Sequence, residues 1–297
     1  MIEAGRLITA MVTPFNDKGE VDYDQARKLA LALLDSGSEG LVVVGTTGES
    51  PTLTRDEERR LFAEVKSAVA GRGVVIAGTG SNSTAEAIEA TRAAEEIGVD
   101  ACLLVVPYYN KPSQEGLYQH FRAIAESTGL PCILYNVPSR TVVSVSAETI
   151  IRLSQIDNIV GLKEASGNMQ QVARVIEGTA DDFLVWSGND TDTIPILALG
   201  GYGVISVVSH VVGNQIKQMI DSFLAGDTTT AAASHRRLLP LVNALFVMAN
   251  PIPTKYALNH IGFPVGDPRL PLTPPDEKAA AFIRETLKDY KIDLPLQ

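Results

Sequence analysis

The sequence predicts a single (β/α)8 barrel with additional helices at its C-terminal end. Eight short apolar runs rich in β-branched residues alternate with amphipathic stretches, each run about twenty to thirty residues after the previous one. The runs are apolar throughout, which is typical of a parallel sheet covered on both faces. A doubly wound open sheet is the alternative, but no glycine-rich dinucleotide-binding motif follows the first run to favour it.

Each predicted strand is a short stretch dominated by aliphatic residues. The strands are expected at residues 7–11, 40–44, 73–77, 101–105, 132–135, 159–163, 183–186 and 203–207. The clearest helices between them are expected at residues 24–36, 54–70, 84–97, 114–128 and 169–177. Two helices begin with a capping pattern, Thr54 followed by Glu57 and Ser83 followed by Glu86, which satisfies free backbone N–H groups.

The C-terminal part of the chain has helical spacing at residues 231–249, 253–260 and 275–289, with Pro- and Gly-rich turns between. No linker-like composition precedes it. We therefore expect residues 227–297 to pack as a helical extension on a barrel formed by residues 1–226. Its expected role is stabilisation or contact between subunits, in preference to a second active domain.

Composition restricts the classes of partner. The 297 residues are 45% hydrophobic and 20% charged, and a net charge of −10 argues against nucleic acid or an anionic membrane as the main partner. No run is long enough to span a bilayer and the start lacks a secretory pattern, so a cytoplasmic location is expected. Cys102 and Cys132 are expected as buried free thiols, and four widely spaced histidines indicate no metal site.

Lys163 is the most informative residue. It ends an apolar run, where burial disfavours the charged ammonium and lowers the pKa. A neutral amine attacks carbonyl carbon, so the chemistry indicated is a Schiff base with an oxo-acid. The alternative is a lysine whose ammonium reaches solvent from the strand end.

Polar groups also follow the second and fourth predicted strands, and barrel active sites lie at this end of the strands. The turn after the second strand carries Thr46 and Thr47 between glycines, where hydroxyls and backbone amides can bind a carboxylate or relay a proton. The loop after the fourth strand carries Tyr108 and Tyr109 between prolines. This pair indicates presentation at a site or an interface, with simple surface packing as the alternative.

The later strands add a phenol and a guanidinium. Tyr135 ends the fifth strand, and Arg140 follows with a planar fork suited to a carboxylate. Gly188 and the glycines before Ile205 permit close approach of the backbone to a ligand. A lysine, phenols, hydroxyls and an arginine on one rim fit imine formation followed by proton transfer on an oxo-acid.

These segments resemble the pyruvate-dependent class I aldolases, most closely the dihydrodipicolinate synthase family. The resemblance covers nearly the whole chain and rests on four blocks whose spacing also matches: Gly45-Thr46-Thr47-Gly48-Glu49, Pro107-Tyr108-Tyr109-Asn110-Lys111-Pro112, Tyr135-Asn136-Val137-Pro138-Ser139-Arg140-Thr141 and Gly161-Leu162-Lys163-Glu164-Ala165-Ser166. It implies condensation of pyruvate with L-aspartate 4-semialdehyde to 4-hydroxy-tetrahydrodipicolinate, in diaminopimelate and lysine biosynthesis. It also implies no cofactor, no metal, and a homotetramer built as a dimer of tight dimers.

The resemblance assigns the proton-transfer groups. Lys163 would form the imine with pyruvate, and Tyr135 would act beside it as general acid and base. Thr46 would link Tyr135 to Tyr109, which relatives take from a neighbouring subunit.

The resemblance also assigns the substrate-binding groups. Thr47 would bind the pyruvate carboxylate and Arg140 the carboxylate of the semialdehyde, while Gly188 and Ile205 would offer backbone carbonyls. The sequence departs from the family at Val142, where relatives often have glycine. Because valine resists left-handed φ angles, this places the backbone path beside Arg140 in question.

A regulatory pocket for L-lysine at the tight-dimer interface is implied as well. Its residues here would be Ser50, Pro51, Asn82, Glu86 and Tyr108. Two further positions, often histidine in lysine-sensitive relatives, are Arg55 and Glu58. Arg55 would place a permanent cation near the ligand's ammonium, so weak or absent inhibition is expected. The alternative is that Arg55 and Glu58 are solvated residues at the start of a helix.

Two other functions compete with the synthase. A sister lyase that cleaves a sialic or deoxy-sugar acid would use the same Lys163 and Tyr135, but Arg140 favours a substrate with a second carboxylate. A non-catalytic oxo-acid-binding protein would need neither side chain. Fold alone does not decide among the three.

Overall fold

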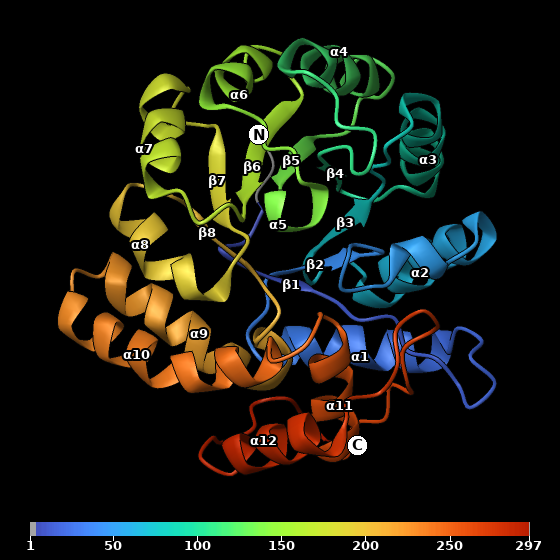
Figure 1. Cartoon of the computed structure of the whole chain (residues 1–297), viewed down its shortest axis with the longest axis vertical. Helices are drawn as coiled ribbons and strands as arrows, with labels where there is room; N and C mark the ends of the chain where they lie inside the picture. Colours follow the sequence, from blue (N-terminus) through green and yellow to red (C-terminus); the bar gives the residue numbers. More distant parts are fainter. Residues whose placement is uncertain (1–3, 297) are drawn as a thin grey trace.

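The computed structural model describes residues 4–296, and its strands form a closed, entirely parallel barrel in sequence order from β1 to β8. Figure 1 shows the helices arranged around these strands. The predicted (β/α)8 barrel is confirmed, and the open-sheet alternative is excluded because β8 pairs with β1.

The elements follow one another as strand, helix, strand around the barrel. The strands are β1 (Leu7–Ala10), β2 (Gly40–Val43), β3 (Val74–Gly78), β4 (Ala101–Val105), β5 (Cys132–Asn136), β6 (Ile159–Glu164), β7 (Leu184–Ser187) and β8 (Gly203–Ser206). The helices are α1 (Tyr23–Asp35), α2 (Arg55–Val69), α3 (Thr84–Ile97), α4 (Gln114–Ala125), α5 (Pro138–Thr141), α6 (Ala147–Leu153), α7 (Met169–Gly178), α8 (Thr193–Ala198), α9 (Ser209–Leu224), α10 (Thr228–Leu245), α11 (Ile252–His260) and α12 (Glu277–Leu287), with short 3-10 helices η1 (Ser50–Thr52) and η2 (Asp190–Asp192).

Alternation along the strands separates two layers of core. Inward-pointing residues such as Ile8, Ile76, Ile133 and Trp186 fill the barrel interior, and Tyr135 belongs to this layer. Outward-pointing residues pack under the helices; examples are Leu41, Val75, Leu104 and Leu134. Every predicted strand is present, because both layers require the continuous apolar runs that identified the strands.

The predicted helix caps are present as well. Thr54 and Glu57 form a reciprocal capping box at the start of α2, and the Ser83 hydroxyl accepts from Glu86 N at the start of α3. Four helices were not predicted, namely α5, α6, α8 and α9. The last of these contains a non-helical residue, Val212, with φ −130° and ψ 42°, which interrupts its periodicity.

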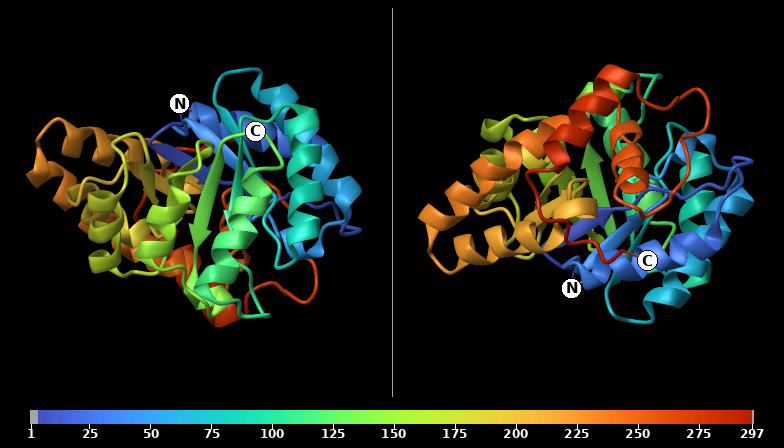
Figure 2. Two further views of the ribbon diagram at one scale, coloured as in Figure 1. Left: turned by 90° about the horizontal axis from the view of Figure 1, so that it is seen from above. Right: turned by 90° about the horizontal axis from the view of Figure 1, so that it is seen from below.

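The C-terminal helices pack on the outside of the barrel. A second apolar cluster joins Leu7 and Val204 of the barrel to Val211 of α9, Leu241 of α10 and Ile283 of α12. Figure 1 labels α10, α11 and α12 on the lower side of the barrel, and Figure 2 shows these orange-to-red helices from two further directions. The division at residue 226 falls in the turn between α9 and α10, and treating the two parts as separate domains remains a prediction. Among residues 4–296, no helix has the length and apolar character needed to cross a membrane.

Candidate active site

Lys163 and Tyr135 lie side by side in the mouth of the barrel. They are paired residues on neighbouring strands β6 and β5, and Lys163 Nζ is 4.2 Å from the centroid of the Tyr135 ring. Only 5% of Lys163 and 7% of Tyr135 is exposed. The structure thus excludes the alternative of an ammonium that reaches solvent.

The surroundings of Lys163 make its amine a better nucleophile. Burial disfavours the ammonium and, with the nearby positive charge of Arg140, lowers the pKa of Lys163 to about 7 despite the opposing charge of Asp190. A substantial fraction of the amine is therefore neutral near neutral pH. Burial also raises the pKa of Tyr135 to about 12, against the opposing effects of Arg140 and a side-chain hydrogen bond with Thr46. The phenol consequently carries its proton and can donate it.

Asp190 supplies the nearby negative charge. Its carboxylate accepts hydrogen bonds from the Ser206 hydroxyl and from Val207 N at 3.0 Å and Val208 N at 3.4 Å. These donors hold a buried carboxylate in place, although desolvation raises its pKa. Asp190 was not among the residues predicted from the sequence, because nothing local reveals donors sixteen or more residues away.

Thr47 and Arg140 both contact one residue of the C-terminal segment. Asn250 Nδ2 donates to Thr47 Oγ1 at 2.8 Å, and the Asn250 carbonyl oxygen accepts from Arg140 Nη2 at 3.2 Å. Thr47 is buried, whereas Arg140 is exposed on the short helix α5. Asn250 was not predicted from the sequence, because the Asn-Pro dipeptide indicates a turn but does not reveal the residues that Asn250 contacts.

Gly188 lies against Lys163, whereas Ile205 lies two strands away on β8. A Cβ atom on Gly188 would lie 3.2 Å from Lys163 Cγ and 2.8 Å from Ala165 Cβ, so this position requires glycine for close packing. Ile205 lies on β8, fully buried in the same inner cluster as Tyr135.

Val142 adopts the conformation that glycine would favour. Its φ of 65° and ψ of −32° lie outside the regions that a β-branched residue occupies without strain. The side chain is 69% exposed, so few contacts offset this strain. The backbone beside Arg140 therefore has a positive φ at a valine.

Behind the active pair, a polar clamp joins the same two strands on their outward face. Asn136 Nδ2 donates to both carboxylate oxygens of Glu164 at 3.0 Å, and Ser166 N and Gln171 Nε2 donate to the same group at 2.7 and 3.1 Å. Glu164 is 1% exposed. The clamp fixes the register of Tyr135 against Lys163, one residue earlier on each strand.

Tyr109 does not reach this chamber within one chain. It is 90% exposed, with a φ of 73°, in the loop after β4. Asn82 and Asn110 tie this loop to the loop after β3: Asn82 Nδ2 donates to Tyr108 O at 3.1 Å, and Asn110 Nδ2 to Asn82 O at 2.8 Å. The structure therefore brings together the other groups of the expected relay and leaves this phenol pointing outward.

A separate pocket of about 220 Å³ contains most of the expected regulatory residues. Its lining includes Ser50, Pro51, Arg55, Glu86 and Tyr108. The alternative of a solvated Glu58 is wrong: that residue is 7% exposed, its burial raises its pKa, and its carboxylate pairs with Arg55 at 2.8 Å. Sequence could not show this, because the helix face that carries Glu58 is buried by its neighbours. Arg55 also lies 3.5 Å from Glu86.

Comparison with known proteins agrees with this geometry. The model of the dihydrodipicolinate synthetase family matches residues 3–290. The chain is 69% identical over 297 residues to the 4-hydroxy-tetrahydrodipicolinate synthase of Dehalococcoides mccartyi, covering 100% of both. It is 56% identical over 286 residues to that of Moorella thermoacetica, covering 95% of this chain and 98% of the relative.

Solved structures show the same fold over nearly the whole chain. A dihydrodipicolinate synthase of Bacillus anthracis superposes with a TM-score of 0.96 at 49% identity, covering 98% of this chain and 100% of the other. The enzyme of Cyanidioschyzon merolae, solved with lysine bound, gives a TM-score of 0.95 at 53% identity, covering 96% and 97%. With a barrel that places a buried lysine beside a tyrosine, and with matches of this extent, the chain belongs to the dihydrodipicolinate synthetase family.

Proposed function

We propose that this chain is a 4-hydroxy-tetrahydrodipicolinate synthase, which condenses pyruvate with L-aspartate 4-semialdehyde in diaminopimelate and lysine biosynthesis. The observation that carries the proposal is the buried Lys163 amine, with a pKa of about 7, against the Tyr135 ring in a barrel of this family. Its class is a lyase of the Schiff-base aldolase type.

The proposed reaction begins with the neutral Lys163 amine. It attacks C2 of pyruvate, and loss of water gives an imine on Nζ. Removal of a C3 proton gives an enamine, whose C3 attacks the aldehyde carbon of the second substrate and forms the new carbon–carbon bond. The substrate's own amine then attacks C2, closes the ring and releases Lys163. Tyr135 gives and takes the protons, because its phenol lies next to Nζ.

Two groups are proposed to hold the substrates. Thr47 binds the pyruvate carboxylate, and Arg140 binds the carboxylate of the semialdehyde through its planar fork. Gly188 and Ile205 supply carbonyl oxygens around the reacting carbons. The exposed position of Arg140 on α5 supports contact with a second substrate that enters after pyruvate.

The assembly is proposed to be a homotetramer in which a neighbouring subunit supplies Tyr109. Thr46, already hydrogen-bonded to Tyr135, would pass protons between the two phenols. The almost complete exposure of Tyr109 supports a contact outside its own chain. A cytoplasmic location is proposed on the presence of two buried free thiols, Cys102 and Cys132.

One pair of experiments tests the reaction. Sodium borohydride added with pyruvate is expected to fix a three-carbon adduct on Lys163, located by peptide mass spectrometry. A coupled assay is expected to show condensation with aspartate semialdehyde and no cleavage of sialic or deoxy-sugar acids. Lys163→Arg is expected to lose both activities because its guanidinium stays protonated. Labelling elsewhere, or preferred sugar-acid cleavage, would contradict the proposal.

Arg140→Ala separates the two substrates. It is expected to weaken use of the semialdehyde by about 2–5 kcal/mol while leaving the pyruvate adduct intact. Equal loss of pyruvate trapping would show that the assignment of Arg140 is wrong.

A further inference from the structure

Asn250 is the one described residue that hydrogen-bonds to both proposed carboxylate-binding groups. It lies just before α11, about two hundred residues beyond Thr47, and is 6% exposed. Its side chain contacts Thr47, and its main-chain carbonyl contacts Arg140. One residue of the C-terminal segment therefore connects the two binding groups.

The direction of the first hydrogen bond matters for binding. A threonine hydroxyl has one proton to donate and can also accept. Because Asn250 Nδ2 donates to Thr47 Oγ1, the Thr47 proton is not used in this contact. It remains available for an anionic acceptor, and a hydrogen bond to a carboxylate is stronger than one between neutral groups. If an acceptor stood at the position of Nδ2, it would compete for that proton.

Stability does not account for this asparagine. Within the described residues, the buried Asn250 Oδ1 accepts no hydrogen bond. A buried polar atom without a partner carries a desolvation cost, so a residue serving the fold alone gains little from this amide. Its contacts with Thr47 and Arg140 offer a functional reason for an asparagine at this position.

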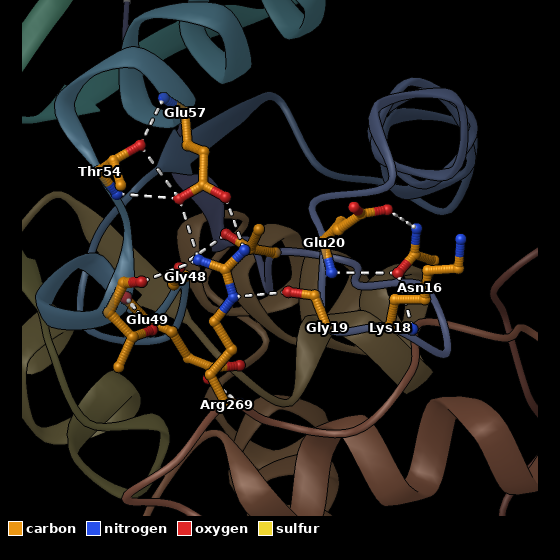
Figure 3. Close-up of polar contacts among 11 residues, drawn as sticks. Asn16, Lys18, Gly19, Glu20, Gly48, Glu49, Thr54, Glu57 and Arg269 are labelled. Atoms are coloured by element: carbon orange, nitrogen blue, oxygen red, sulfur yellow. Dashed lines mark hydrogen bonds and ion pairs between the residues drawn. The ribbon is translucent and has the colours of Figure 1, made fainter.

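The segment that carries Asn250 is firmly attached to the turn that carries Thr47. Lys255 Nζ, in the first turns of α11, pairs with Glu49 Oε1 at 2.8 Å, and each side chain is 1% exposed. The other Glu49 oxygen accepts from Arg269 N at 2.9 Å, and the Arg269 guanidinium binds Glu57 at 2.6 Å. Figure 3 shows Arg269 between Glu57 and Gly19, with Glu49 alongside.

We propose that Asn250 is a positioning residue that orients the Thr47 hydroxyl as a hydrogen-bond donor to the carboxylate of the oxo-acid and holds Arg140 through its main-chain carbonyl. The proposal rests on the proposed function. It predicts that the side chain of Asn250 acts on pyruvate through Thr47, whereas its effect on Arg140 survives any side-chain substitution.

Pyruvate affinity, measured by borohydride trapping over a range of pyruvate concentrations, provides the test. Asn250→Ala is expected to weaken it about tenfold. Asn250→Asp has nearly the same shape but places an acceptor opposite Thr47, so a larger loss is expected. In both variants the KM for aspartate semialdehyde is expected to change less than the affinity for pyruvate, because the main-chain carbonyl remains.

A double-mutant cycle identifies Thr47 as the route. Thr47→Val removes the hydroxyl, so adding Asn250→Ala to it is expected to cause no further loss of pyruvate affinity. Asn259→Ala is the matched control, because Asn259 lies in α11, the helix that follows Asn250, and bonds Gly266 O and Val265 N without contacting Thr47. It is expected to lower the melting temperature and leave pyruvate affinity unchanged.

The outcomes separate this inference from the proposed function. No trapping in the wild type would overturn both. Trapping at Lys163 together with fully additive losses in the cycle, or an unchanged affinity in Asn250→Ala, would overturn the role of Asn250 alone. If Asn250→Ala does not fold, the isosteric Asn250→Asp decides: unchanged pyruvate affinity in that variant rejects the proposal.

Discussion

At the scale of single residues, burial and charge oppose one another around the Lys163 amine. Removal from water is the larger effect and favours the neutral amine, while the carboxylate of Asp190 favours the ammonium. The resulting pKa near 7 lies well below the ordinary value of 10.5. Between these two values the folded protein binds fewer protons than the unfolded chain, so the contribution of Lys163 to stability rises with pH over that window.

The same pKa predicts how imine formation depends on pH. Below about 7 the amine is protonated and cannot attack, so the initial rate of pyruvate trapping is expected to rise as pH increases through about 7 and then level off. Asp190→Asn removes a charge that raises the pKa, so the midpoint is expected to move to lower pH. A midpoint near 10 would contradict this account of Lys163.

Strain at Val142 predicts a stabilising substitution. Val142→Gly is expected to raise the free energy of unfolding by about 1 kcal/mol, because glycine occupies positive φ without the steric cost that valine carries. Urea unfolding measures the change. Val247→Gly is the control: Val247 is also exposed but is not among the positive-φ residues, so glycine there is expected to destabilise. Equal effects at both sites would reject the argument from strain.

Arg55 predicts the response to L-lysine. Its guanidinium lies 2.8 Å from Glu58 and 3.5 Å from Glu86, so it uses the carboxylates that would attract a ligand ammonium. We expect weak or absent inhibition in a titration of activity with L-lysine. Arg55→His removes the permanent charge at neutral pH and is expected to strengthen inhibition. Strong cooperative inhibition of the wild type at sub-millimolar lysine would overturn this prediction.

At the scale of elements, the paired strands β5 and β6 carry different chemistry on their two faces. Tyr135 and Lys163 point into the barrel, and the next residue of each strand, Asn136 and Glu164, points outward. The outward pair sets the register of the inward pair. A shift of one residue would exchange the two faces, so this clamp keeps the reactive groups inside.

Glu164→Gln tests the clamp. In the native protein, Asn136, Ser166 and Gln171 donate hydrogen bonds to the Glu164 carboxylate. The amide of the variant would turn its own N–H groups toward some of these donors, so we expect a loss of about 2–3 kcal/mol in the free energy of unfolding. Loss of activity is expected to accompany it through kcat. Glu148→Gln is the matched control, because Glu148 lies at the surface, where its ion pair is with Arg174, and its effect is expected within about 0.5 kcal/mol. Equal losses would reject a special role for the clamp.

The elements that sequence predicted are those whose signals are local. The strands are apolar runs, and the caps of α2 and α3 lie within four residues. Helix α9 was missed although its second half carries a local signal, with Ile216, Met219 and Ile220 buried at helical spacing. The contact of Asn250 with Thr47 joins residues that are 203 positions apart, so no local pattern reveals it. Lys163 could be identified because a cation within an apolar run is anomalous by itself.

At the scale of the whole molecule, one side chain of the expected relay is missing from the chamber. Tyr109 is 90% exposed, whereas Tyr135 is 7% exposed. The sequence indicates that Tyr109 and Tyr135 are both candidates. It does not show whether Tyr109 acts in its own chain or in a neighbouring copy, because an interface between copies leaves no periodic pattern in the sequence. In the proposed homotetramer, the exposed Tyr109 of one copy would complete the chamber of another.

Mixing variants tests this sharing of sites. Tyr109→Phe and Lys163→Ala are each expected to be poor alone, and subunit exchange is expected to restore activity because a hybrid dimer contains one site with both groups intact. Native mass spectrometry verifies the hybrids, and two Lys163→Ala preparations mixed together provide the control. Verified hybrids without activity would favour a relay within one chain.

The contacts between the turn after β2 and the C-terminal segment also set the order in which the molecule becomes competent during synthesis. Glu49 is translated about two hundred residues before its cationic partner Lys255, and Glu57 before Arg269. Until the last part of the chain leaves the ribosome, Glu49 has neither its ammonium nor the Arg269 backbone donor, and Thr47 has no Asn250 beside it. A nascent barrel that already contains Lys163 and Tyr135 therefore lacks these contacts, and release of the final helices completes them.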